Sequence, residues 1–195
     1  KGDSNIVAYL FEPIQGEGGI RYPQEGYLKR VRELCTKYNV LMIADEIQTG
    51  LGRTGKLKCC DWEGVRPDIM TIGKSLSGGF YPISACFADK DIMDLINPGE
   101  AMTTYGGNPL AAVIAKRSIE VLYEEGLIDN ALELGKHLEK ELRTFNHKFI
   151  KDIRAGKGLY AGIELDSSIK AFTVATRLAE KGLISHPAST VNVIR

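Results

Sequence analysis

The chain has 195 residues, and its 25 lysine and arginine side chains balance its 25 aspartate and glutamate side chains, so its formal net charge is zero. This balance argues against nucleic acid or an anionic membrane as the main partner, because both are bound through an excess of positive charge. With 44% hydrophobic and 26% charged residues, the composition is typical of a globular protein with one or two domains. No apolar run approaches the length of a membrane span, so no contact with a membrane is expected.

The first part of the chain alternates apolar runs with an amphipathic segment. A buried strand is predicted over residues 6–11, followed by a helix over 23–38 whose apolar side chains share one face. Further strands are predicted over residues 40–44, 69–72 and 83–87. Strands that are separated by a helix or by long connections indicate a parallel α/β sheet.

The second part of the chain has a different pattern. A helix is predicted from Asn108 to about residue 125, with a proline suited to its first turn, and a charge-rich helix over 127–145. Three strand-like segments and one further helix follow, at residues 149–154, 158–165 and 191–194 and at 169–181. This α+β pattern predicts a smaller domain over residues 126–195, beside a larger domain over 1–125.

Cysteine and histidine residues do not form a metal-binding pattern. Cys35, Cys59, Cys60 and Cys86 show no C-x-x-C spacing, and the three histidines do not cluster with them in the sequence. No metal site is therefore expected. Few, irregularly placed cysteines in a chain that can build a core indicate reduced thiols. We therefore expect an intracellular protein, from the cytoplasm or the mitochondrial matrix.

Lys74 occupies the most informative position in the sequence. It follows the predicted strand at 69–72, and glycines at 73, 78 and 79 let the backbone of this turn approach another group closely. Open α/β sheets bind ligands at the carboxyl ends of their strands. A lysine that is shielded from water there has its charged form disfavoured and can attack a carbonyl carbon. The alternative is a solvated loop lysine without a chemical role.

Two acidic residues are placed in the same way. Glu12 and Asp45 come directly after the first and second predicted strands, so we expect Glu12, Asp45 and Lys74 at one edge of the sheet. Asp45 and Lys74 could form a plain ion pair, because a buried carboxylate needs a partner. They could instead bind a pyridine-ring cofactor, which needs a lysine for a Schiff base and a carboxylate beside its ring nitrogen. Residues 103–108 (TTYGGN) would then offer hydroxyls and backbone amides to its phosphate.

Four motifs follow one another along the chain. They are EPIQGE at residues 12–17, ADEIQTGLGRTG at 44–55, GKSLSGG at 73–79 and TYGGNPL at 104–110. Together they resemble the class III (ω-) aminotransferases, and the likeness extends over essentially the whole chain. The resemblance implies a pyridoxal 5′-phosphate enzyme of the fold-type-I architecture. Its large domain would have a mostly parallel sheet, of which this chain is the second half, and its C-terminal domain would be a smaller α+β unit.

Softer similarities point to one branch of the class. Residues 66–68, 79–84 and 191–195 are most similar to the ornithine δ-aminotransferases. This similarity implies transfer of the δ-amino group of L-ornithine to 2-oxoglutarate, giving glutamate 5-semialdehyde and glutamate. N-acetylornithine or 4-aminobutyrate aminotransferase is the alternative within the class.

The resemblance also implies roles for individual residues. Lys74 would hold the cofactor as a Schiff base and then move the proton between substrate carbon and cofactor carbon. Asp45 would pair with the ring nitrogen, Ile47 would pack on one face of the ring, and Gln48 would hydrogen-bond near the ring hydroxyl. Thr104 would reach the phosphate of a second subunit's cofactor, so the active unit would be a homodimer with shared active sites.

Three further residues would serve the substrate. Glu12 would support the site from close by. Glu17 and Arg195 would form an ion pair that masks the arginine while the diamine reacts and opens when 2-oxoglutarate brings two carboxylates. A plain salt bridge is the alternative for this pair.

The sequence departs from the family pattern before Thr104. Residues 101–103 (AMT) stand where the family usually has His-Gly-Ser, which puts phosphate affinity or the dimer contact in doubt. Residues 154–158 (RAGKG) carry one residue more than the family's turn. The family's first half has no counterpart here, so we expect a part of an enzyme that has little or no turnover as an isolated piece.

Other classes of function fit the sequence less well. A P-loop would need glycine where Asp68 stands, and a dinucleotide fingerprint would need a small residue in place of Arg21. A non-catalytic interaction protein with an aminotransferase fold is a further alternative. The presence of Lys74, Asp45 and Gln48 argues against this loss of chemistry.

Overall fold

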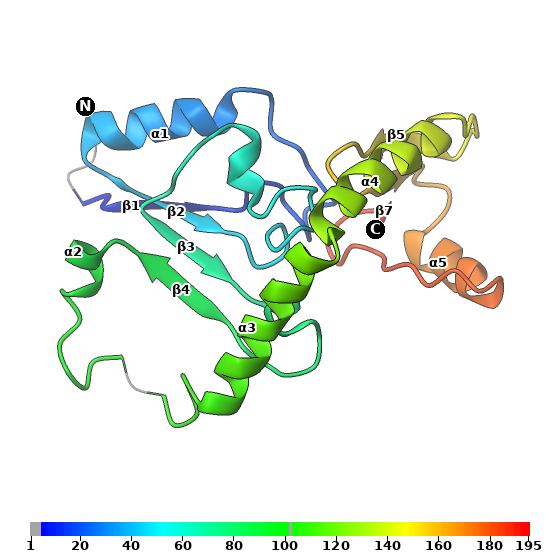
Figure 1. Ribbon diagram of the computed structural model, residues 1–195. Coiled ribbons are helices and arrows are strands. Elements are labelled where there is room, and N and C mark those ends of the chain that lie inside the picture. The colour runs from blue at the N-terminus through cyan, green and yellow to red at the C-terminus, as the bar shows by residue number, and fades with distance from the viewer. Residues whose placement is uncertain (1–4, 102) are drawn as a thin grey trace.

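The computed structural model describes residues 5–101 and 103–195, which form two β-sheets joined by two long helices (Figure 1). The first sheet has the order β1 (Ala8–Phe11), β2 (Leu41–Asp45), β3 (Ile69–Ile72) and β4 (Ala85–Ala88). The second sheet has the order β5 (Ile150–Arg154), β6 (Gly162–Leu165) and β7 (Val193–Ile194). Each predicted strand is found, with ends that differ by a few residues.

The first three strands of the larger sheet are parallel, as predicted, but the fourth is not. Tyr9 pairs with Met42 and Ala44 with Met70 in parallel register, whereas Ile72 pairs with Ala85 in an antiparallel ladder. The connection from β3 to β4 holds only the one-turn 3₁₀ segment η2 (Lys74–Ser77). Without a crossover helix the chain reverses along the sheet, so β4 becomes an antiparallel edge strand.

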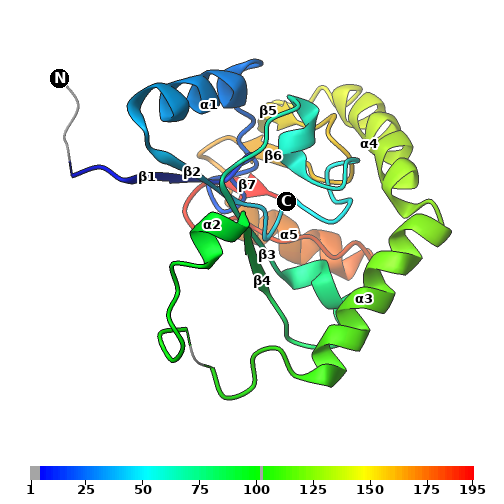
Figure 2. The same cartoon turned by 60° about the vertical axis from the view of Figure 1, so that its left-hand side comes forward.

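Helix α1 (Tyr27–Tyr38) covers one face of this sheet (Figure 2). Its Leu28 and Cys35 pack with Phe11, Met42 and Ala44 in one apolar cluster. The helix begins four residues later than predicted, after Gly26 at φ 81°. Residues of both signs of charge occupy its outer face, so the amphipathic pattern sets the packing.

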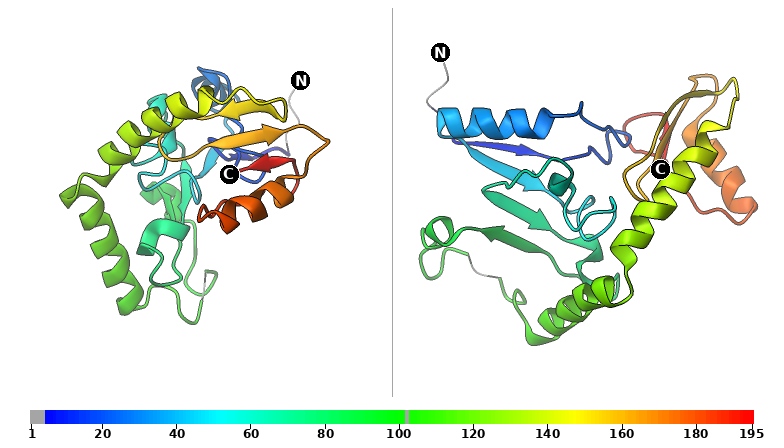
Figure 3. Two further views of the ribbon diagram at one scale, coloured as in Figure 1. Left: turned by 90° about the vertical axis from the view of Figure 1, so that its right-hand side faces the viewer. Right: turned by 45° about the horizontal axis from the view of Figure 1, so that its top comes forward.

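Helices α3 (Pro109–Glu124) and α4 (Leu127–Arg143) run one after the other along the side of the molecule and connect the two sheets (Figure 3). Ala115 of α3 packs with Ile72 and Leu76, so α3 holds the turn that carries Lys74. Asn108 caps α3, because its Oδ1 accepts a hydrogen bond from the Ala111 N–H at 2.9 Å. The short helix α2 (Lys90–Met93) was not predicted.

The second sheet packs against helix α5 (Ala171–Glu180) through Leu165, Ala171 and Ile194. All of its strand pairs are antiparallel. The chain passes from the first sheet to the second through α4, which begins at Leu127. The domain boundary near residue 126 stays a prediction.

Strand β1 is more exposed than expected. Leu10 of β1 is 65% exposed and the preceding Val7 is 69% exposed. The strand pairs only with β2, so its other edge has no neighbour within the described part of the chain. Across those same residues, no helix is both long and apolar enough to span a bilayer.

Candidate active site

Three predicted site residues lie at the same edge of the larger sheet. Glu12, Asp45 and Lys74 come at or just after the ends of β1, β2 and β3, and these strands are parallel. The carboxylate of Asp45 is held in place, because Oδ1 accepts the Ile47 N–H at 3.0 Å and the Thr71 hydroxyl at 3.4 Å. The sheet therefore presents a fixed negative charge at its carboxyl edge.

Lys74 is exposed rather than shielded as the sequence suggested. It opens η2 with φ 44°, a left-handed conformation that is uncommon outside glycine. It lines an open cavity of about 930 Å³ together with residues 81–85 and 105–108. The prediction that Lys74 is shielded from water is therefore wrong for the described residues, because none of them covers this cavity.

The plain ion pair between Asp45 and Lys74 is not found among residues 5–101 and 103–195. Asp45 and Glu12 line a separate cavity of about 660 Å³. The loop after Asp45 and the turn before Lys74 lie close together, since a Cβ added at Gly73 would be 3.6 Å from Ile47 Cγ2. The amine and the carboxylate thus stand on neighbouring loops and are both open to a ligand.

The loop before α3 carries the predicted phosphate donors. Thr103 and Thr104 are exposed, and Gly107 has φ 68°. The Asn108 amide donates to the Tyr105 carbonyl at 2.8 Å, which holds the loop in a turn. The predicted effect of Met102 on this loop lies outside the described residues.

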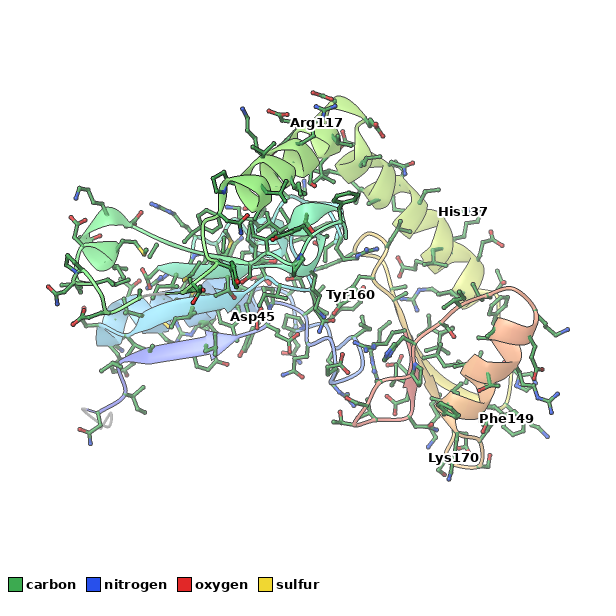
Figure 4. All side chains as sticks on the ribbon, turned by 90° about the horizontal axis from the view of Figure 1, so that it is seen from below. Asp45, Arg117, His137, Phe149, Tyr160 and Lys170 are labelled. Atoms are coloured by element: carbon green, nitrogen blue, oxygen red, sulfur yellow. The ribbon has the colours of Figure 1, made fainter. Side chains whose placement is uncertain are left out.

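Gln48 has a partner that the sequence did not reveal. The hydroxyl of Tyr160 donates to Gln48 Oε1 at 3.0 Å, across a separation of 112 residues. Burial raises the pKa of the Tyr160 phenol to about 12, and the nearby Glu12 carboxylate adds to the rise. Figure 4 labels Asp45 on the first sheet and Tyr160 at the junction with the second part.

Glu17 and Arg195 form the predicted ion pair, with 2.7 Å between Oε1 and Nη1. The Ser189 hydroxyl also donates to Glu17 Oε2 at 2.9 Å. This hydrogen bond, followed by Arg195, lowers the pKa of the Glu17 carboxyl below its ordinary value. The Arg195 side chain is only 14% exposed and contacts His186 Nδ1 at 3.1 Å, so the arginine is held on both sides.

The loop that carries Glu17 is anchored at two places. Glu12 Oε2 accepts the Gly16 N–H at 3.0 Å, which holds the loop, while its predicted support of the substrate stays a prediction. Arg154 of β5 donates to the Gly19 carbonyl at 2.6 Å and pairs with Glu164. The sequence did not single out Arg154 for this contact, because it links segments 135 residues apart.

Glu46 is a buried carboxylate that the sequence analysis passed over. It is 1% exposed, and its two oxygens accept the Thr49 hydroxyl at 2.5 Å and the Cys59 and Cys60 N–H groups at 2.9 and 2.8 Å. These bonds tie the loop after β2 to the segment at 59–62. Burial, and after it the negative charge of Glu46, raises the pKa of the Cys59 thiol to about 12, so this thiol stays protonated at neutral pH.

The arrangement fits a pyridine-ring aldehyde cofactor. It offers an accessible amine, a carboxylate held by two hydrogen bonds and an amide whose orientation is set by Tyr160. Its open cavities have the volume of ordinary small-molecule sites, about 300–1,000 Å³. No group of three or more potential metal ligands occurs within the described ranges.

Comparison with known proteins shows the family of the chain. The family model for aminotransferase class III matches residues 1–195. The mitochondrial ornithine aminotransferase of Drosophila melanogaster is 51% identical over 185 residues, which are 95% of this chain and 43% of that protein.

Two solved structures extend the comparison. An ornithine aminotransferase from Toxoplasma gondii ME49 superposes with a TM-score of 0.92 at 47% identity, over 96% of this chain and 45% of that one. An acetylornithine aminotransferase from Elizabethkingia anophelis superposes with a TM-score of 0.88 at 46% identity, over 96% of this chain and 48% of that one.

The chain thus spans less than half the length of these relatives. The predicted fold class is confirmed: a mostly parallel sheet and a smaller antiparallel sheet, which together form a portion of the fold-type-I architecture. The family match covers every residue of the chain. The four sequence motifs lie in the segments that follow β1, β2 and β3 and that lead into α3. The chain belongs to the class III aminotransferases.

Proposed function

We propose that the complete protein transfers the δ-amino group of L-ornithine to 2-oxoglutarate, giving glutamate 5-semialdehyde and glutamate. The observation that carries the choice of ornithine is the 2.7 Å ion pair between Glu17 and Arg195. The relatives that are named ornithine aminotransferases support the same choice. The protein would act in the cytoplasm or the mitochondrial matrix.

Pyridoxal 5′-phosphate, when bound, supplies an aldehyde carbon that reacts with amines and a ring that accepts electrons from the substrate carbon. Lys74 Nζ would hold the cofactor and carry the proton between the two carbons. Asp45 would keep the ring nitrogen protonated, since its carboxylate is fixed at the edge of the sheet. Ile47 would pack on the ring, and Gln48 would bind the ring oxygen.

Thr104 would reach the phosphate of a second copy's cofactor, which makes the active unit a homodimer. Its exposure and its place beside the cavity of Lys74 support this role. The loop is held in a turn by Asn108, so its hydroxyls and amides need little reordering to bind an anion.

Glu17 would act as a gate for Arg195. While ornithine reacts, the pair keeps the arginine occupied, so a second carboxylate finds no partner. When 2-oxoglutarate binds, its distal carboxylate would replace Glu17 on Arg195 through a bidentate contact. Because the pKa of Glu17 is lowered, its carboxylate stays charged at neutral pH and the ion pair persists. The pair is lost only when the pH falls below the ordinary pKa of a glutamate side chain.

Replacing Glu17 with alanine tests the gate. We expect the preference of Glu17→Ala for ornithine over glutamate as amino donor to fall at least about tenfold, equivalent to about 1.4 kcal/mol. The ratio of the two kcat/KM values measures this preference. Ser189→Ala is the matched control, because it removes one hydrogen bond to Glu17 but leaves the ion pair, and we expect a smaller change. An unchanged ratio in Glu17→Ala would reduce the pair to a plain salt bridge.

Reductive trapping tests the chemistry itself. Pyridoxal 5′-phosphate is added to the full-length protein, followed by borohydride, digestion and mass mapping of the modified peptide. A pyridoxyl group on Lys74 is expected, because this amine lines the open cavity at the edge of the sheet. No adduct, or one on another lysine, would favour a non-catalytic interaction protein that keeps the fold.

A second candidate substrate follows from the structural neighbour named acetylornithine aminotransferase, at 46% identity. A substrate panel separates the candidates. Ornithine should give a higher kcat/KM than N-acetylornithine or 4-aminobutyrate in the full-length protein. Of these three donors only ornithine has two free amino groups, and the closed Glu17–Arg195 pair is proposed to serve such a diamine. The reverse order would assign the protein to the other branch.

A further inference from the structure

Tyr160 connects the second part of the molecule to the cofactor side of the site. It lies between β5 and β6, and its hydroxyl donates to Gln48 Oε1 at 3.0 Å. Its backbone carbonyl accepts the Tyr22 hydroxyl at 2.6 Å, so the residue is held at both ends. The side chain also lies near the charges of Glu12, Glu17 and Arg195. Tyr160 thus stands between the proposed gate and the loop of Gln48.

The direction of the hydrogen bond decides which end of the Gln48 amide is free. An amide has a carbonyl that accepts and an NH₂ that donates. With Oε1 bound to Tyr160, the NH₂ group is the end of the amide that is left for another acceptor. The reversed amide would place its NH₂ against the phenol and leave the phenol proton without an acceptor, and an unsatisfied donor in a partly buried position is costly. The phenol stays protonated at neutral pH, since its pKa is raised to about 12.

We propose that Tyr160 is a positioning residue that fixes the Gln48 amide so that its NH₂, rather than its carbonyl, faces the ring oxygen of the cofactor. This inference rests on the proposed function, in which Gln48 binds that oxygen. A donor next to an oxygen stabilises its ionised form, whereas a carbonyl would repel the negative charge. Tyr160 therefore sets the acidity of the cofactor's ring oxygen without touching it.

Gly16 makes room for this contact. A Cβ at Gly16 would lie 2.4 Å from Gln48 Oε1 and 2.5 Å from Tyr160 Oη, closer than atoms can approach. The obstacle is space, because Gly16 is not among the residues with positive φ. At Gly18, on the same loop, an added Cβ would lie 3.1 Å from Oε1 of the exposed Gln15 side chain, its nearest neighbour. The two glycines form a matched pair for mutation.

The visible absorption of the bound cofactor against pH tests the proposal in the full-length protein. In Tyr160→Phe the Gln48 amide loses its fixed orientation, so the midpoint of the absorption change should rise by about 0.5–1 pH unit, the size expected for one hydrogen bond of ordinary net strength. Gly16→Ala should cause a rise in the same direction, because it forces the pair apart. Gly18→Ala should leave the midpoint unchanged.

Two controls separate positioning from a general structural role. Tyr9→Phe removes a phenol whose hydrogen-bond partner is the Tyr27 hydroxyl rather than Gln48 or Tyr160, and its midpoint should match the wild type. In a Gln48→Leu background, Tyr160→Phe should have no further effect, since its action passes through the amide. A midpoint that is unchanged in Tyr160→Phe, or a shift that persists in Gln48→Leu, would overturn the inference.

Failure of this inference is distinct from failure of the proposed function. Reductive trapping on Lys74 in wild type and in Tyr160→Phe reports cofactor binding independently of the midpoint. If both proteins form the adduct and their absorption midpoints are equal, only the role of Tyr160 is rejected. The absence of any adduct on Lys74 rejects the proposed function, and the role of Tyr160 with it.

Discussion

Replacing Lys74 with arginine is expected to lower kcat for transamination by at least about 10³-fold, within the range attributed to a positioned acid–base group. Arginine keeps the positive charge and much of the length of the side chain, but it is not deprotonated in proteins and cannot act as a nucleophile. Both side chains also carry a Cβ, so the left-handed backbone at φ 44° is strained equally in the two proteins. The loss therefore reports chemistry rather than folding.

Steady-state turnover and the borohydride adduct of the full-length protein measure this loss together. Lys90→Arg is the matched control, because Lys90 is exposed on α2, where it pairs with Asp94. Its activity and its adduct should equal those of the wild type. Turnover in Lys74→Arg above a tenth of the wild-type value would show that Lys74 is not the nucleophile.

Replacing Glu46 with alanine is expected to lower the free energy of unfolding by about 4 kcal/mol. The change removes the acceptor of the Thr49 hydroxyl and of the Cys59 and Cys60 N–H groups, and these donors lie in the interior. Each buried donor without a partner costs about 1–3 kcal/mol. In a full-length protein more than twice as long as this chain, like the relatives, a loss of this size corresponds to a fall of roughly 4 °C in the thermal midpoint.

Thermal unfolding of the full-length protein measures the effect, with Glu33→Ala as control. Glu33 forms an exposed ion pair with Arg30 at 2.8 Å, and such surface pairs contribute at most about 1 kcal/mol. Glu46→Gln should fall between the two, because the amide keeps one acceptor but turns an NH₂ toward other donors. Equal midpoints for Glu46→Ala and Glu33→Ala would show that the buried hydrogen bonds do not stabilise the fold.

Much of the fold follows from local sequence. The apolar runs at β1, β2 and β3 predict strands because alternate side chains pack on the two faces of a sheet, and α1 follows from its apolar face. Residues at parallel strand ends meet at one edge by geometry alone, which is why Asp45 and Lys74 could be placed together. The reversed direction of β4 could not be predicted, since it depends on the path of the connection and not on the strand itself.

The sequence by itself determined the approximate places of the strands, the chemistry of the residues that follow them and the class of the protein, because these depend on short-range patterns and ordered motifs. Only the tertiary structure decided that Tyr160 holds Gln48, that Arg154 holds the loop at Gly19, and that Glu46 turns inward while Asp45 meets the ligand edge. The Tyr160 and Arg154 contacts join segments far apart in the chain. They exist because the second sheet docks against the loops of the first, and docking of this kind leaves no periodic signal in the sequence. Glu46 turns inward because its partners, Thr49, Cys59 and Cys60, lie in the interior beside the loop after β2.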